Sequence, residues 1–212
     1  MRCVSRKTLL SAAIVTITGS LGFAPVQAQN GGGATYRATL SPLNGSGAQG
    51  EATLTKHGQE LTVHITASGL EPGGPHISHI HGLSQGGAAV DSRCPTTALD
   101  SDRDGFVELA EGAVTYGPIL VDFMNIDPDQ DGNVDFTTTV QLAGNSEATP
   151  LNKRHIVIHG MTVGAVGAGS PGEVNGEPGY KTVLPVLCGE IMNGPNAKGA
   201  LQFRQPKVTS HH

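Results

Sequence analysis

Hydrophobic and polar residues alternate with a period of two along several segments of the chain. In the segment "ELTVHITA", residues 60–67, every second position is apolar and the positions between them are polar. Because successive side chains of an extended strand point to opposite faces, this alternation predicts a strand with one buried face. The apolar positions of the alternating segments are Ala52, Leu54, Leu61, Val63, Ile65, Ala67, Val134, Phe136, Val140, Leu142, Ile156 and Ile158.

Turn-forming residues separate these segments, and no segment has the apolar spacing of an amphipathic helix. The turn signals include "PLNGSG", "KHGQ" and "EPGG", which are rich in glycine and proline. The pattern predicts an all-β protein, an antiparallel sandwich or barrel, closed by the segment "TVLPVLCGEIM". Two regions break the alternation: residues 91–132 are acidic and loop-like, and residues 161–180 are a long Gly-rich loop. Loops of such length in a compact domain are usually functional or disordered.

The first 28 residues have the three parts of a secretory signal peptide. A basic start, "MRCVSRK", precedes an apolar run, and "VQA" before Gln29 is a small-residue cleavage signal. A membrane anchor is the alternative, but the run is short and interrupted by Ser, Thr and Gly. The sequence therefore predicts an exported protein whose mature chain, residues 29–212, is one domain with an insertion at about 95–133 and no membrane span.

Charge and the missing motifs exclude several function classes. The predicted signal contains 3 of the 13 basic residues, which leaves 10 basic against 18 acidic residues in the mature chain. An acidic chain without a basic patch argues against nucleic-acid binding. The sequence has no C-x-x-C. Strings of the form G-x-S-x-G (residues 82–86) and G-x-G-x-x-G (residues 45–50 and 167–172) do occur, but none of them leads into a segment with helical apolar spacing. The hydrolase and nucleotide-binding templates require such a helix, so they do not apply. A small molecule remains the expected partner.

The histidines form the sharpest candidate site. His79 and His81 lie two positions apart in "GGPHISHIHGL", residues 73–83, and would share one strand face. His159 ends a separate outward-facing row. Three neutral imidazoles suit copper or zinc far better than calcium or magnesium, although exposed surface histidines are the alternative. His155 lies on the same face as His159 but roughly 13 Å along an extended strand, which predicts that it is too far away for the same ion.

An acidic segment matches the calcium loop of an EF-hand. In "DSDRDGFVELAE", residues 100–111, positions 1, 3, 5, 6 and 12 are Asp100, Asp102, Asp104, Gly105 and Glu111. Carboxylates at alternate positions converge around the turn at glycine, and the last Glu can bind through both oxygens. This spacing predicts a calcium site, with a solvated acidic loop as the alternative.

A second segment, "DPDQDGNVDFTT" at residues 127–138, is a weaker calcium candidate. It supplies Asp127, Asp129 and Asp131, but Thr138 stands where the motif has Glu.

Two cysteines remain once Cys3 is removed with the signal. Cys94 and Cys188 form an even pair in an exported chain, which predicts one disulfide. Such a bond would stabilise the fold by up to roughly 4–5 kcal/mol in the chain-entropy model. Two separate buried thiols are the alternative.

The order of these motifs resembles the copper–zinc superoxide dismutase family. The resemblance is carried by "SGL…PGGPHISHIHG", then Cys94, then "RHIVIHG", then "LPVLCGEI". It covers most of the mature chain and is most specific over residues 60–94 and 153–191. It implies a Greek-key β-barrel, superoxide as substrate and a disulfide between Cys94 and Cys188. It further implies copper ligands at His79, His81 and His159, with His76 as a supporting histidine that hydrogen-bonds backbone beside the site.

The chain also departs from that family at the zinc site and at the guiding arginine. The family places a bridging histidine and zinc ligands after the first cysteine, whereas "CPTTALDSDRDGFVELAEG" contains no histidine; we therefore expect no zinc. Pro185 stands where the family has an arginine that guides superoxide, so attraction of an anion should be poor.

A second resemblance fits the front half of the chain. The S-G-L…H-I-H-G pattern is similar to the chordin-type CHRD domain, a β-structured module of secreted proteins. Two functions follow from the sequence: an exported copper-binding superoxide dismutase-like oxidoreductase, or a non-enzymatic metal-binding or calcium-stabilised extracellular module. His211 and His212 are a native tail or the remnant of a tag.

Overall fold

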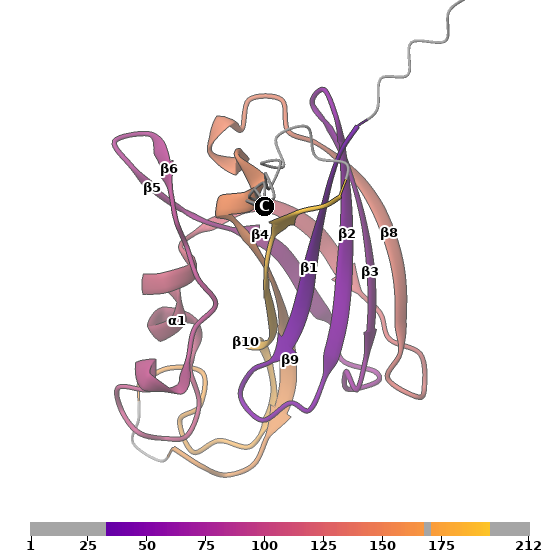
Figure 1. Ribbon diagram of the computed structural model, residues 1–212. Coiled ribbons are helices and arrows are strands. Elements are labelled where there is room, and N and C mark those ends of the chain that lie inside the picture. The colour runs from indigo at the N-terminus through magenta and orange to yellow at the C-terminus, as the bar shows by residue number, and fades with distance from the viewer. Residues whose placement is uncertain (1–32, 168–170, 196–212) are drawn as a thin grey trace, which may run out of the picture. The chain divides into compact units, whose positions relative to one another are not determined.

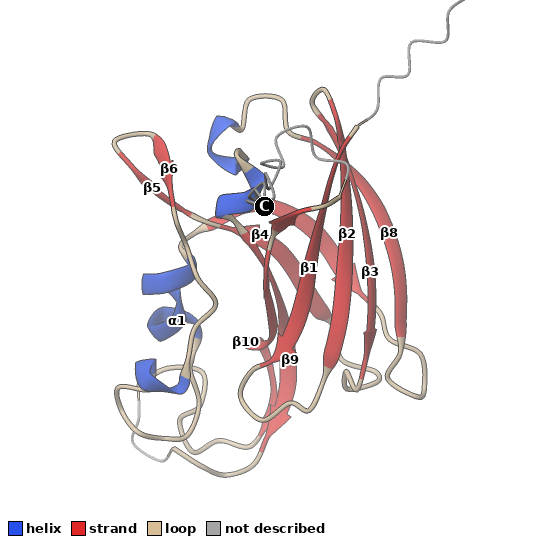
Figure 2. Ribbon diagram, viewed as in Figure 1, coloured by secondary structure: helices blue, strands red, loops and turns tan. Residues whose placement is uncertain are grey.

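The computed structural model describes residues 33–167 and 171–195, so the predicted signal peptide and His211 and His212 lie outside the described residues. This part of the chain is built mainly of antiparallel strands, which confirms the predicted all-β class (Figures 1 and 2). No helix in these two ranges is both long enough and apolar enough to cross a membrane.

Eight strands form the main sheet, with a short ninth strand and a separate hairpin beside it. The eight are β1 (Ala34–Pro42), β2 (Gln49–His57), β3 (Glu60–Ser68), β4 (His76–His81), β7 (Ile119–Ile126), β8 (Val134–Gln141), β9 (His155–Val163) and β10 (Gly179–Glu190). The short strand is β11 (Met192–Asn193) and the hairpin is β5 (Leu83–Gln85) with β6 (Ala88–Val90). The helices are η1 (Thr97–Leu99), α1 (Leu109–Tyr116), η2 (Ser146–Ala148) and η3 (Leu151–Lys153).

The strand order is that of a Greek-key barrel. It runs β7-β4-β9-β10-β1-β2-β3-β8, and the two end strands β7 and β8 approach each other to nearly close the barrel. Strands β1 to β3 form a meander, and the chain then crosses to β4 in the other half. It returns to the meander at β8 and crosses again to β9. These crossings bring β4 and β9 side by side, although more than 70 residues separate them in sequence.

The predicted alternation places its apolar residues in the barrel core. The side chains of Leu61, Val63 and Ile65 on β3 are fully buried, as are Ile156 and Ile158 on β9. Burying an aliphatic side chain of this size stabilises the fold by about 1.5–3 kcal/mol. The core thus fixes which face of each strand points inward, and by exclusion which residues point away from the barrel.

The structure corrects the prediction that residues 91–132 are loop-like and that no helix forms. Strand β7 pairs with β4 in the main sheet, and α1 begins at a capping box in which Glu108 and Glu111 satisfy each other's backbone N–H groups. The Gly-rich loop is also shorter than predicted, because β9 continues to Val163 and β10 begins at Gly179.

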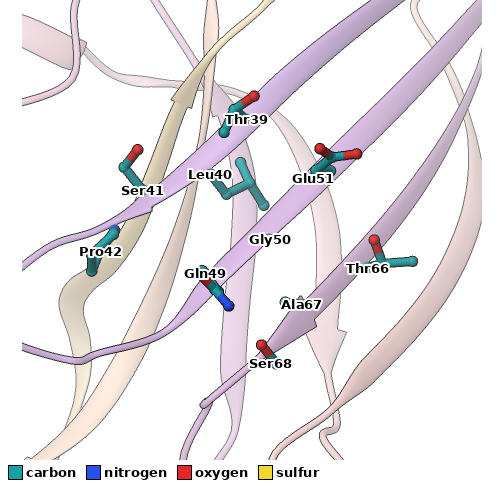
Figure 3. A pocket seen from close by; sticks show the side chains of 10 residues that line it. All are labelled: Thr39, Leu40, Ser41, Pro42, Gln49, Gly50, Glu51, Thr66, Ala67 and Ser68. Carbon is teal, nitrogen blue, oxygen red and sulfur yellow. The ribbon is translucent and has the colours of Figure 1, made fainter.

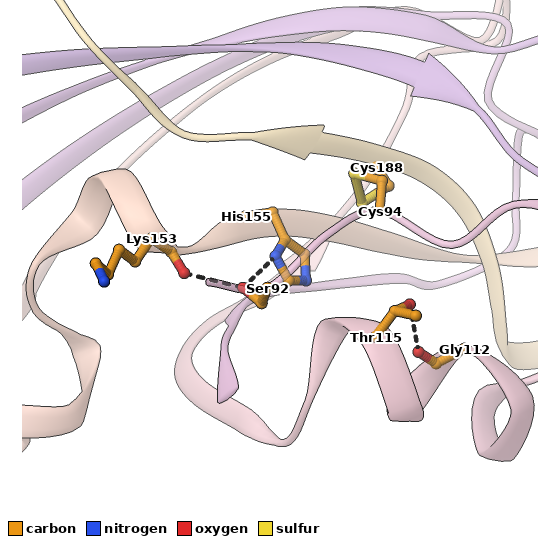
Figure 4. Close-up of a disulfide and its surroundings, with 7 residues drawn as sticks. All are labelled: Ser92, Cys94, Gly112, Thr115, Lys153, His155 and Cys188. Atoms are coloured by element: carbon orange, nitrogen blue, oxygen red, sulfur yellow. Dashed lines mark hydrogen bonds between the residues drawn. A yellow bond between two sulfur atoms is a disulfide. The ribbon is translucent and has the colours of Figure 1, made fainter. Parts of the chain in front are cut away.

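A disulfide joins Cys94 to Cys188, as the sequence predicts (Figure 4). It ties the segment before α1 to β10, and Cys188 packs with Tyr116 and Val157 in a small apolar cluster. Disulfides are typical of proteins exported to oxidising compartments. The bond holds α1 and its preceding loop against the outer surface of the barrel.

Candidate metal centre

Neighbouring strands bring the three predicted histidines together. His79 and His81 stand on β4, and β4 pairs with β9, which carries His159 near its centre. One ring nitrogen from each of the three lies within 4.8 Å of the others. The ring centroid of His79 is 5.5 Å from that of His81 and 5.5 Å from that of His159. These three residues could hold a metal ion.

The histidines point away from the barrel core, but they are not exposed as their outward positions suggested. His79 is 6% exposed, and His81 and His159 are each 1% exposed. The reason is the cover over this face: the Tyr116 ring of α1 lies 4.9 Å from the His81 ring. The small remaining exposure of His79 marks the side on which the cluster meets solvent.

Each of the three rings has one buried nitrogen without a hydrogen-bond partner. These atoms are Nδ1 of His79 and Nε2 of His81 and His159. The other nitrogens of two rings donate to backbone carbonyls, His81 Nδ1 to Gly117 at 2.9 Å and His159 Nδ1 to Val183 at 2.7 Å. A neutral ring that donates through Nδ1 keeps its lone pair on Nε2. Such outer hydrogen bonds are the usual way in which metal-binding histidines are oriented.

Burial keeps these rings neutral at physiological pH. Burial lowers the pKa of His81 to about 4, against a raising effect of its bond to Gly117. Burial likewise lowers the pKa of His159 to about 3. The pKa of His79 is also lowered by burial, although the nearby Asp122 carboxylate opposes the change. Neutral imidazoles with free lone pairs are the form that binds a cation.

His76 lies behind the cluster. One of its ring nitrogens is 3.0 Å from the backbone oxygen of His159, and the other is 2.9 Å from the backbone oxygen of Glu71. The ring is fully buried. It therefore braces the backbone of β9 at the residue that presents the third imidazole.

His155 stays outside the set of three but lies closer to it than its spacing from His159 suggested. It pairs in register with His81, and their rings are nearly parallel with centroids 6.2 Å apart. Its Nδ1 forms a hydrogen bond of 3.0 Å with Ser92 Oγ, and the Ser92 hydroxyl donates to the backbone oxygen of Lys153 (Figure 4). His155 is therefore close to the cluster because β4 and β9 pair in antiparallel register, which places it opposite His81, and not because of its distance from His159 along β9.

Arg154 is a supporting residue that the sequence did not single out. The residue is 1% exposed, and its guanidinium donates to the backbone carbonyls of Leu83, Val90, Lys153 and Glu147. These bonds fasten the β5–β6 hairpin beside β9. A Cβ at Gly82, directly after His81, would overlap the Arg154 side chain, so the close approach requires glycine at that position.

The structure gathers part of the first calcium-loop motif. Carboxylate oxygens of Asp100, Asp102 and Asp104 lie within 4.8 Å of one another. Glu111 is not in this group, because its carboxylate accepts the backbone N–H groups of Ser101 and Glu108. Three of the four predicted carboxylate ligands are thus close together, and calcium binding here stays a prediction.

The second calcium-loop motif does not converge in this way. Asp129 accepts backbone N–H groups of Asp131 and Asn133. Within residues 33–167 and 171–195, Asp127, Asp129 and Asp131 do not form a group of the same kind.

We predict that substituting Glu111 by Gln weakens calcium binding at residues 100–111. The substitution removes one negative charge and one of the two acceptor oxygens, so the remaining oxygen keeps either the bond from Glu108 or the bonds from Ser101. The calcium-free protein should therefore lose about 1 kcal/mol of stability. Calorimetric titration of calcium into both proteins measures the difference. Equal calcium affinities for the two proteins would remove Glu111 from the site.

We also predict that the metal-free protein loses stability below pH 6.5. The folded-state pKa values of His81, His155 and His159 are lowered to about 4, 3 and 3, mainly by burial. The unfolded chain therefore takes up protons first as the pH falls. Stability should be fully present above pH 6.5 and should decline towards pH 4, as measured by urea unfolding of chelator-treated protein. Equal unfolding free energies at pH 7.5 and pH 5 would contradict this.

No protein-family model and no curated protein matches this chain.

A groove of about 530 Å³ lies elsewhere, on strands β1, β2 and β3 (Figure 3). It is lined mostly by polar and small residues, including Thr39, Glu51 and Thr66, and its lining contains no histidine or cysteine. The histidine cluster, and not this groove, carries the recognisable chemistry.

Proposed function

We propose that this chain is an exported copper protein whose three-histidine centre dismutates superoxide. The observation that carries the proposal is the set of three buried, unpartnered imidazole nitrogens of His79, His81 and His159. Leaving a buried polar atom without a partner costs about 1–3 kcal/mol, and a bound ion would remove that cost. Imidazole ligands suit copper, and copper has the highest affinity of the first-row divalent metals for a given nitrogen site.

The donor set fits copper in both its number and its orientation. The lone pairs of His81 and His159 are held by the bonds that their Nδ1 atoms make to Gly117 and Val183. Bound copper would supply one-electron exchange between Cu(I) and Cu(II). The protein's own contribution is to hold the three rings, and to exclude water through the cover formed by Tyr116 and the disulfide-linked segment.

The proposal includes slow capture of superoxide. Pro185 pairs in register with His159, so a proline stands beside the site at the position where the resembling family carries its guiding arginine. A surface without that cation should attract an anion poorly. We expect dismutation to be slower than in the copper–zinc enzymes and less dependent on salt.

Export is part of the same proposal. The predicted signal peptide and the disulfide between Cys94 and Cys188 both favour an oxidising compartment. Copper that enters such a compartment would meet the site after the chain has folded and oxidised.

A second candidate function is a metal-binding module without catalysis, of the CHRD-like or calcium-stabilised kind. The observations that favour it are Pro185 beside His159 and the three aspartates gathered at residues 100–104. Under this alternative the histidines would hold an ion without turning over substrate.

Metal analysis and a superoxide assay on the mature protein distinguish the two functions. The protein is purified without added metal, its copper content is measured, and superoxide decay is followed at low and high ionic strength. A His64→Ala variant is the control, because His64 is a half-exposed residue paired with Asp135. Copper-dependent decay supports the dismutase. Tight copper binding together with superoxide decay no faster than in protein-free buffer would favour the metal-binding module without catalysis.

A further inference from the structure

His79 differs from the other two histidines in how its ring is held. His81 and His159 each donate Nδ1–H to a backbone carbonyl, whereas no such bond orients the ring of His79 in the described part of the chain. The buried Nδ1 of His79 has no partner. Its other nitrogen, Nε2, lies 3.7 Å from the Oδ1 atom of Asp122.

A β-bulge places Asp122 at that position. On the paired strands β4 and β7, His79 is opposite Asp122 and Ile77 is opposite Asn125, so β7 contains one extra residue over this stretch. Met124, within the bulge, has φ of 74°, and its backbone N–H donates to Asp122 Oδ1 at 2.7 Å. Bulges re-aim side chains and are common beside functional sites.

The carboxylate selects one of the two neutral forms of the His79 ring. A negative oxygen beside Nε2 favours the proton on that nitrogen, which leaves the lone pair on Nδ1. In the His79 ring, Nδ1 is the buried nitrogen without a hydrogen-bond partner. The present separation of 3.7 Å exceeds hydrogen-bond distance by several tenths of an ångström, which a small ring or side-chain rotation can close.

We propose that Asp122 is a positioning residue that orients His79 and fixes its tautomer, so that Nδ1 binds the metal. The proposal rests on the proposed function only in requiring a metal ion at the three histidines, and it does not depend on superoxide as substrate. Asp122 acts on the metal through His79 and is not itself a ligand.

Two measurable effects follow from removing the charge. Asp122→Asn keeps a side-chain oxygen for the Met124 N–H but loses the negative charge, and it should weaken copper binding about tenfold. The same change should raise the Cu(II)/Cu(I) reduction potential, because a nearby carboxylate stabilises the more highly charged ion. Asp122→Ala should weaken binding further, because the oxygen is also lost.

Competition titrations and potentiometry on the full mature protein test the proposal. The matched control is Asp135→Asn, which neutralises a carboxylate that contacts a different histidine, His64, at 2.8 Å. The expected result is weaker copper binding and a raised potential for Asp122→Asn, with Asp135→Asn equal to wild type. Wild-type affinity and potential in Asp122→Asn would overturn the role of Asp122. Failure of the wild-type protein to bind copper would instead overturn the proposed function.

Discussion

Replacement of His159 by alanine is expected to abolish tight copper binding while the β-barrel remains folded. The substitution removes one of the three converging nitrogens. Loss of an outer-shell partner alone costs 10–100-fold in metal affinity, so loss of a ligand should cost at least about 100-fold. The fold should persist because the side chain lies outside the barrel core, and the backbone oxygen that contacts His76 is retained.

The measurement is a copper titration against a competing chelator, with circular dichroism to verify the fold. His64→Ala serves as the matched control, since it also removes an imidazole from a strand. If His159→Ala bound copper as tightly as the wild-type protein, the assignment of the site would be wrong.

Substitution of Arg154 by Met is expected to destabilise the protein by about 3 kcal/mol or more. Arg154 is 1% exposed, and its guanidinium donates to four backbone carbonyl groups. Methionine fills much of the volume but donates no hydrogen bond. The Lys153 carbonyl keeps the Ser92 hydroxyl as a donor, whereas each buried carbonyl that is left without a donor costs about 1–3 kcal/mol. The β5–β6 hairpin should loosen as a consequence, because two of the bonds reach Leu83 and Val90.

Urea unfolding of the wild-type and Arg154→Met proteins measures this loss. Arg93→Met is the control, because Arg93 is exposed and its substitution should change stability by less than about 0.5 kcal/mol. An Arg154→Met protein as stable as the control would show that the buried guanidinium contributes no net stability.

Much of the barrel could be predicted from the sequence because apolar and polar residues alternate along several of its strands. On β3, the side chains of Leu61, Val63 and Ile65 are all fully buried, as expected for apolar residues that recur at every second position of a strand. The two-residue spacing of His79 and His81 likewise fixed their shared face. Their convergence with His159 depends on the pairing of β4 with β9, which local spacing does not encode and which only the family resemblance suggested.

Strand β7 and helix α1 were not predicted from the sequence, because neither has a regular local pattern of apolar and polar residues. Strand β7 contains a bulge at Met124, which breaks the alternation that would have marked residues 119–126 as a strand. Helix α1 has only eight residues, too few to show helical spacing. Its capping box uses Glu111, which is also the last residue of the calcium-loop pattern. In the sequence this residue therefore indicates a calcium loop, and the start of the helix is not recognised from it.

Burial of the histidines is a tertiary effect. Seen from β4 and β9 alone, the three rings point outward, and nothing in those strands indicates a cover. The cover comes from Tyr116 on α1 and from the segment tied down by Cys94 and Cys188. Similarly, Arg154 and Asp122 gain their roles from carbonyl groups and a bulge that only the folded chain brings near them.

X-ray absorption at the copper edge of the mature protein, titrated with copper, tests the three-histidine copper site most directly. We expect saturation at one copper per chain, three imidazole nitrogens bound to the copper, and loss of that signal in His159→Ala. A protein that binds no copper tightly, or a copper ion bound mainly by carboxylate oxygens, would rule out this site.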